Sequence, residues 1–184
     1  MTPADRALLA RAAELHRPLA RAARSGRWNG LGYAVFGCLS LLLASMDLDM
    51  VGIALGAFLL AVGLGERAQA ARLLRADGVA ARRLVQLELA LLGAIALYGI
   101  LGLTVLPSSG EALQRQLHGL GGSGVDIRRL AHSIDRAWYA SVIAVALLYQ
   151  GGMALHFHRR RRDVERYLRE VPAWARDVVQ SMAR

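Results

Sequence analysis

The sequence contains no lysine and only one cysteine among its 184 residues. Cys38 therefore has no partner within the chain, which excludes an intramolecular disulfide bond. All 23 basic residues are arginine, and they occur beside abundant alanine, glycine and leucine. This composition is typical of a protein from a GC-rich bacterial genome.

Catalytic and cofactor motifs are missing too. We find no P-loop, nucleophile elbow, HExxH zinc motif or dinucleotide fingerprint, and no Asp/Asp pair within the apolar segments. His156 and His158 are two residues apart and face away from each other on a helix. The histidines therefore lack the three or four ligands of a zinc site. We expect no catalytic residue, no cofactor and no metal, and we do not expect an enzyme.

Four apolar segments dominate the rest of the sequence, at residues 28–46, 48–65, 84–106 and 137–157. Each is about as long as the roughly 17–25 residues that a helix needs to cross a bilayer. The sequence therefore predicts an all-α polytopic membrane protein with four transmembrane helices. We expect amphipathic interfacial helices at both termini and in the outer loop.

The arginines indicate how these spans are oriented. Nineteen lie in residues 1–27, 65–83 and 156–184, and only four lie in residues 107–136. Basic residues stay on the cytoplasmic side during insertion. We therefore predict a multi-pass protein of a bacterial inner membrane with cytoplasmic N- and C-termini. Its net charge of +9 would meet anionic lipid headgroups, so the bilayer is the expected partner and nucleic acid is not.

Residues 1–27 are expected to form a cytoplasmic amphipathic helix. Thr2-Pro3-Ala4-Asp5 combines a hydroxyl cap, a proline at the first helical position and an early carboxylate. Pro18 should kink or end this helix. Beyond the second span we expect the helix to continue until Asp77-Gly78 breaks it.

Residues 158–184 are expected to form a cytoplasmic basic and amphipathic tail, interrupted at Pro172. Trp174, Val178 and Met182 share one helical stripe, which should rest on the membrane or on the end of the bundle. In the outer loop, residues 107–136, we expect two short amphipathic helices; the alternative is a poorly ordered glycine-rich loop.

Glu88 is the strongest candidate for a functional residue. It lies five residues beyond Arg83, about 7 Å further along the helix. Ionisable groups at membrane depth are costly and often functional, so Glu88 could carry a proton, bind a cation or line a pore. It could instead be an interfacial carboxylate paired with an arginine such as Arg82. Matching depths along antiparallel spans three and four, we hypothesise a structural pair of Glu88 with His156.

Further polar side chains in spans three and four complete the candidate intramembrane polar site. They could line a hydrated path, but hydrogen bonding between helices is the favoured interpretation. These side chains are Gln86, Tyr98, Tyr149 and Gln150.

Other residues are expected to anchor the helices at the interface or to pack them together. Tryptophan and arginine at the ends of spans are typical anchors, and glycine lets helix backbones approach closely. The expected anchors are Trp28, Trp138, Arg82, Arg83, Arg159, Arg160, Arg161, Arg162 and Trp174. The expected packing residues are Gly52, Gly56, Gly151 and Gly152.

One arrangement near the C-terminus resembles a known kind of protein. It consists of Tyr149-Gln150-Gly151-Gly152, then Arg159–Arg162, then the segment from Val164 to Glu170, followed by Pro172 and Trp174. This order, together with the charged start of span three, resembles small bacterial four-span inner-membrane proteins of unassigned function. The resemblance implies a topology and no particular activity.

Two functions remain open. We expect a non-enzymatic membrane protein that acts as a homo-oligomer and could form an ion or solute pathway. The alternative is an accessory or scaffold subunit of a larger membrane complex. A pathway requires the side chains of Glu88, Gln86 and Gln150 to face a common water-filled axis. In a scaffold, these side chains would instead form hydrogen bonds between helices.

Overall fold

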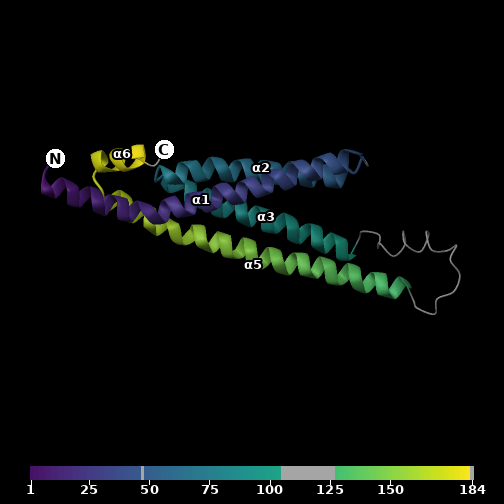
Figure 1. Ribbon diagram of the computed structural model, residues 1–184. Coiled ribbons are helices and arrows are strands. Elements are labelled where there is room, and N and C mark those ends of the chain that lie inside the picture. The colour runs from purple at the N-terminus through teal and green to yellow at the C-terminus, as the bar shows by residue number, and fades with distance from the viewer. Residues whose placement is uncertain (47, 105–126, 183–184) are drawn as a thin grey trace. The chain divides into compact units, whose positions relative to one another are not determined.

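The computed structural model describes residues 1–46, 48–104 and 127–182, and within these ranges the chain is helical apart from short turns (Figure 1). Four of the helices are long and apolar enough to cross a membrane, which confirms the predicted all-α class and its four candidate spans. The helices are α1 (Pro3–Met46), α2 (Met50–Leu74), α3 (Gly78–Thr104), α5 (Ile127–Glu170) and α6 (Ala173–Met182).

The surfaces of the long helices are apolar. Phe36 is 68% exposed and Leu43 is 66% exposed on α1, and Leu148 is 80% exposed on α5. A water-soluble protein rarely exposes contiguous apolar surface on this scale. The exposed side chains therefore support lipid as the solvent of these segments.

The chain divides into two compact parts, each described here by itself. The first comprises residues 1–89 and 153–184, and the second comprises residues 90–152. α1, α2 and α6 lie wholly in the first part, while α3 and α5 contribute to both.

Helix α1 continues through Pro18, so the expected kink or end at this residue does not interrupt the helix. Proline removes one backbone hydrogen bond inside a helix. Leu19 and Ala22, which follow it, are fully buried, and their packing offsets that loss. The predicted boundary at residue 27 is therefore a change of composition within one 44-residue helix.

The segments outside the predicted spans pack on one another. A single apolar core joins the N-terminal half of α1, the α2–α3 turn, the end of α5 and α6. Because these segments bury apolar side chains against each other, the terminal helices belong to a packed bundle. The fully buried core residues include Ala12, Leu19, Leu73, Leu84, Phe157, Val164, Tyr167 and Ala175.

Helix α6 docks on this core by a face other than the stripe of Trp174, Val178 and Met182, so the stripe does not rest on the end of the bundle and its contact with the membrane stays a prediction. Val171, just before the helix, and Ala175 and Val179 within it are buried and spaced four residues apart, as one helical face requires. Trp174 is 43% exposed and Met182 is 80% exposed. The smaller alanine and valine side chains allow close approach, and the stripe of larger side chains points outward.

The turn between α2 and α3 differs slightly from the predicted break at Asp77-Gly78. Helix α2 ends at Leu74, and Ala76 adopts a left-handed conformation with φ of 58°. The Asp77 amide donates to the Arg72 carbonyl at 3.2 Å, as in a Schellman motif. Asp77 then caps α3, since its carboxylate accepts from the Val79 amide at 2.9 Å. Gly78 is therefore the first residue of α3 and does not terminate α2.

The outer loop is described only in part. The first predicted short helix, near residues 108–120, lies outside the described residues. The second predicted segment is helical, and it forms the beginning of α5 at Ile127, continuous with the fourth span.

Helices α1 and α2 form an antiparallel hairpin with small residues along its seam. A Cβ atom on Gly63 would lie 2.6 Å from the Gly30 carbonyl oxygen, and one on Gly37 would lie 2.6 Å from the Leu60 nitrogen. Backbones in such close contact leave no room for side chains. The buried small residues recur every seven positions, at Ala23, Gly30, Gly37 and Ala44 on α1 and at Gly56, Gly63 and Ala70 on α2.

The predicted packing glycines therefore divide into two groups. A Cβ atom on Gly56 would lie 2.9 Å from the Leu41 nitrogen, and one on Gly52 would lie 2.8 Å from the Ala44 Cβ atom. These two residues pack as expected. A Cβ atom on Gly151 or Gly152 would meet nothing within 4 Å in the described structure, so these two do not pack helices within the protomer.

Candidate functional site: a buried carboxyl–amide cluster

Three polar side chains from three helices meet inside the first compact part. Asn29 comes from α1, Glu66 from α2 and Glu88 from α3. Both glutamates are 0% exposed and Asn29 is 8% exposed. Buried carboxyl groups are rare, so this cluster is the strongest candidate site in the described part of the chain.

The amide of Asn29 connects the two carboxyl groups. Its Nδ2 donates to Glu88 Oε1 at 2.8 Å and to Glu66 Oε1 at 3.3 Å. An asparagine amide carries two N–H groups, so each glutamate can receive one of them. The Tyr33 hydroxyl lies 3.4 Å from Glu88 Oε2, which is long for a hydrogen bond of this type.

Neither carboxyl group of the cluster forms an ion pair with a basic side chain in the described part of the chain. Glu66 Oε2 is buried and receives no hydrogen bond from a described group. Two adjacent carboxylates in such surroundings repel each other, and a proton held between them removes the repulsion. The arrangement is therefore chemically suited to hold a proton.

Close backbone approach explains how one short side chain reaches two helices. Gly30 follows Asn29 directly, and a Cβ atom on it would lie 3.0 Å from the Glu66 Cβ atom. Because glycine brings α1 against α2 at this level, the Asn29 amide lies within reach of Glu66. The same side chain then extends to Glu88 on α3.

The hypothesised pair of Glu88 with His156 is not formed. Glu88 accepts its hydrogen bonds from Asn29 and Tyr33. His156 packs edge-on against the Phe157 ring, with centroids 5.6 Å apart, and its buried Nε2 has no described partner. We predicted the partner of Glu88 at the same membrane depth on the fourth span. The structure instead places the partner, Asn29, on α1.

The other candidate polar residues are distributed over both compact parts of the chain. Gln86 is exposed on α3. Tyr98, Tyr149 and Gln150 belong to the second compact part. There Gln150 is buried, Tyr149 is 51% exposed, and Tyr98 packs edge-on against Tyr139 with ring centroids 6.1 Å apart.

The predicted interfacial anchors are mostly exposed. Trp28 is 69% exposed and Trp138 is 66% exposed, as tryptophans at a lipid interface would be. Arg160 differs, because it is half-buried and its guanidinium lies 2.7 Å from Asp163 Oδ2. The exposed arginines of the predicted set are Arg82, Arg83, Arg159, Arg161 and Arg162.

Sequence reasoning missed Asn29, Tyr33 and Glu66. Asn29 follows the interfacial Trp28, and Glu66 directly follows the predicted end of the second span at Gly65. Both therefore lie at the same predicted membrane boundary as the start of span three. Matching depths across all spans, including α1, would have placed these residues near Glu88.

A second polar contact joins the helices outside the predicted spans. The buried His16 lies with Nε2 2.8 Å from the carbonyl oxygen of Leu74, the last residue of α2. This contact satisfies a carbonyl that the end of a helix leaves without an internal partner. The His16 ring also packs against the Tyr167 ring, with centroids 5.5 Å apart. We therefore interpret His16 as a residue that holds helices together.

Within the described residues, no group of three or more metal-ligating side chains could hold a metal ion. In comparisons with known proteins, the chain matches no family model, no curated protein and no solved structure.

Proposed function

We propose that this chain is a non-enzymatic integral membrane protein that serves as an accessory or scaffold subunit. Its work would be to hold other membrane-embedded chains, including further copies of itself. The arginine distribution supports a bacterial inner membrane with both termini in the cytoplasm. The resemblance to small bacterial four-span proteins agrees with that topology.

The main support for this proposal is that Glu88 is hydrogen-bonded to another helix of the same protomer. Glu88 is fully buried and accepts a 2.8 Å hydrogen bond from Asn29 on another helix. A conduction pathway would need this carboxyl group to face water or a passing ion. A group that is enclosed and hydrogen-bonded between helices instead stabilises the arrangement of α1, α2 and α3.

The outer surface of the helices suits contact with other membrane helices. Gly32 on α1 and Gly93 on α3 have open space where a Cβ atom would be, as do Gly151 and Gly152 on α5. In lipid, helices associate through small residues that allow close backbone approach. None of the four glycines is in close contact with a described part of the protomer, which supports binding of a partner helix.

A homo-oligomeric ion pathway is the second candidate function. The observation that favours it is the pair of Glu66 and Glu88 without a basic partner among the described ion pairs. Paired carboxyl groups within a membrane are a common device for moving protons or cations.

Reconstitution separates the two candidates. We would purify the protein into lipid nanodiscs, measure its oligomeric state, and measure proton and cation flux in liposomes. The scaffold proposal expects a stable assembly, alone or with a co-purifying membrane partner, and flux equal to that of protein-free liposomes. Flux that is lost in Glu88→Gln while the protein stays folded would support the pathway and contradict the scaffold.

A further inference from the structure

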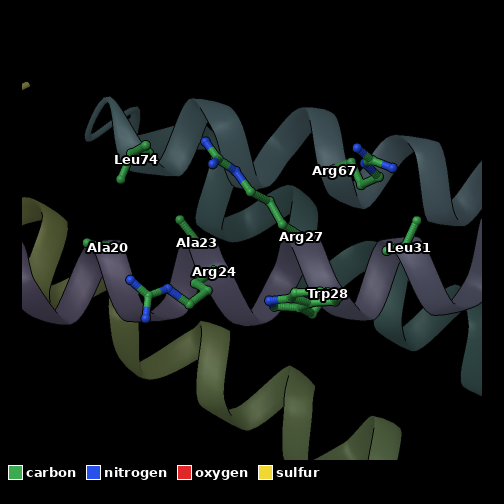
Figure 2. A pocket seen from close by; sticks show the side chains of 8 residues that line it. All are labelled: Ala20, Ala23, Arg24, Arg27, Trp28, Leu31, Arg67 and Leu74. Atoms are coloured by element: carbon green, nitrogen blue, oxygen red, sulfur yellow. The ribbon is translucent and has the colours of Figure 1, made fainter. Parts of the chain in front are cut away.

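A cavity between α1 and α2 is lined by three arginines and a tryptophan (Figure 2). Its volume is about 520 Å³, within the range of pockets that hold small ligands. Arg24, Arg27 and Trp28 come from α1, and Arg67 comes from α2. Figure 2 shows the Arg27 side chain extending from α1 towards α2.

The three arginines have no anionic partner in the described structure. Other arginines of the chain are paired, for example Arg11 with Glu14 and Arg72 with Asp77. Arg24, Arg27 and Arg67 make no such ion pair with a described residue. Three guanidinium groups that line one cavity give it a positive charge, which favours binding of an anion.

The cavity also has an apolar side. Leu31 lines it one helical turn beyond Arg27, and from there α1 continues as the apolar segment of the first span. Trp28, exposed and next to Arg27, is the type of residue that sits at the headgroup level of a bilayer. A ligand that fits both sides carries an anionic group and an apolar body.

We propose that this cavity binds the phosphate group of an anionic phospholipid, with the acyl chains lying along Leu31 and the apolar part of α1. Arginine suits this role because its planar guanidinium can donate two parallel hydrogen bonds to phosphate oxygens. The cavity is therefore a discrete lipid site, distinct from the general attraction between basic residues and a charged membrane. The inference requires a membrane location but does not depend on the scaffold role.

Native mass spectrometry of the protein in non-ionic detergent tests this site. The probes are phosphatidylglycerol, phosphatidylcholine with the same acyl chains, and inorganic phosphate. The cavity variant is Arg24→Gln/Arg27→Gln/Arg67→Gln. The matched control is Arg159→Gln/Arg161→Gln/Arg162→Gln, which removes the same charge from exposed positions outside the cavity.

We expect wild type and the control to retain phosphatidylglycerol in preference to phosphatidylcholine. We expect the cavity variant to bind phosphatidylglycerol about a hundredfold more weakly, at roughly fivefold for each arginine removed. If that variant does not show wild-type helicity by circular dichroism, the single change Arg27→Gln should still weaken binding about fivefold.

Three results would overturn the proposal. Undiminished phosphatidylglycerol binding by the cavity variant would show that the cavity does not hold it. Equal losses in the cavity variant and the control would show attraction by net charge alone. Displacement of the lipid by inorganic phosphate at equal concentration would show a site for soluble phosphate in place of a lipid.

Discussion

The side chain of Asn29 joins Glu88 on α3 to Glu66 on α2 through a single amide nitrogen. Its Nδ2 lies 2.8 Å from Glu88 Oε1 and 3.3 Å from Glu66 Oε1. One short polar residue on α1 therefore links two other helices at this level. Both carboxyl groups are enclosed, so water cannot replace the bonds that Asn29 provides.

Replacing Asn29 with alanine should destabilise the protein by about 2 kcal/mol, because two buried carboxyl groups then lose their donor. The measurement is the free energy of unfolding in detergent micelles. Tyr33→Phe is the matched control: it removes the long 3.4 Å contact with Glu88 and should cost much less. Equal effects of the two changes would show that Asn29 is not the main link.

Replacing both glutamates with glutamine should leave the protein as stable as wild type, or more stable. Glutamine keeps the shape of glutamate and one oxygen that can accept from Asn29, and it removes the repulsion between Glu66 and Glu88. Thermal unfolding of Glu66→Gln/Glu88→Gln in detergent at neutral pH checks this. A large loss of stability would show that the structure requires a carboxylate charge at this site.

Replacing Gly63 with alanine should separate α1 from α2 and destabilise the hairpin by about 1–3 kcal/mol. The added methyl group would lie 2.6 Å from the Ala34 nitrogen and the Gly30 oxygen, which are backbone atoms that cannot move aside. Gly32→Ala is the control, because a Cβ atom there meets nothing within 4 Å. Equal unfolding midpoints for the two variants would contradict the close seam.

Asp77 should contribute a pH-dependent part of the stability outside the spans. The hydrogen bond from the Val79 amide, with the nearby Arg72 guanidinium, holds the pKa of the Asp77 carboxyl below its usual value. A depressed pKa gives stability that is present above the unfolded-state value and is lost as the pH falls through the folded-state value.

Asp77→Ala should therefore cost about 1 kcal/mol at neutral pH, through loss of the helix cap, and less in acid. Thermal unfolding of the variant and wild type at neutral and acidic pH provides the comparison. A difference that stays constant across the acid range would show that the charge of Asp77 does not contribute.

The sequence predicted the long helices well because hydrophobic length is a strong signal. All four apolar segments lie within helices of the structure, apart from Leu48 and Asp49, which precede α2, and the few residues that are not described. The continuation of α1 through Pro18 was not predictable locally, since the packing of Leu19 and Ala22 against distant segments decides it. The docking face of α6 depends on distant packing in the same way.

The candidate site was predicted only in part. Glu88 stood out because a carboxyl group inside an apolar segment is unusual. Its partners did not stand out: Asn29 and Glu66 lie at segment ends, where polar residues are ordinary. Their meeting depends on the close approach of α1 and α2 at Gly30 and Gly63, which is a tertiary feature of the hairpin.

A double-mutant cycle of Asn29→Ala and Glu88→Ala tests most directly the claim that Glu88 is used in a bond between helices of the protomer. The measured quantity is the free energy of unfolding of wild type, the two single variants and the double variant in detergent. We predict an interaction energy of at least about 1 kcal/mol, as expected for side chains in direct contact. Strictly additive effects would contradict the account, because they would show that Asn29 and Glu88 do not interact.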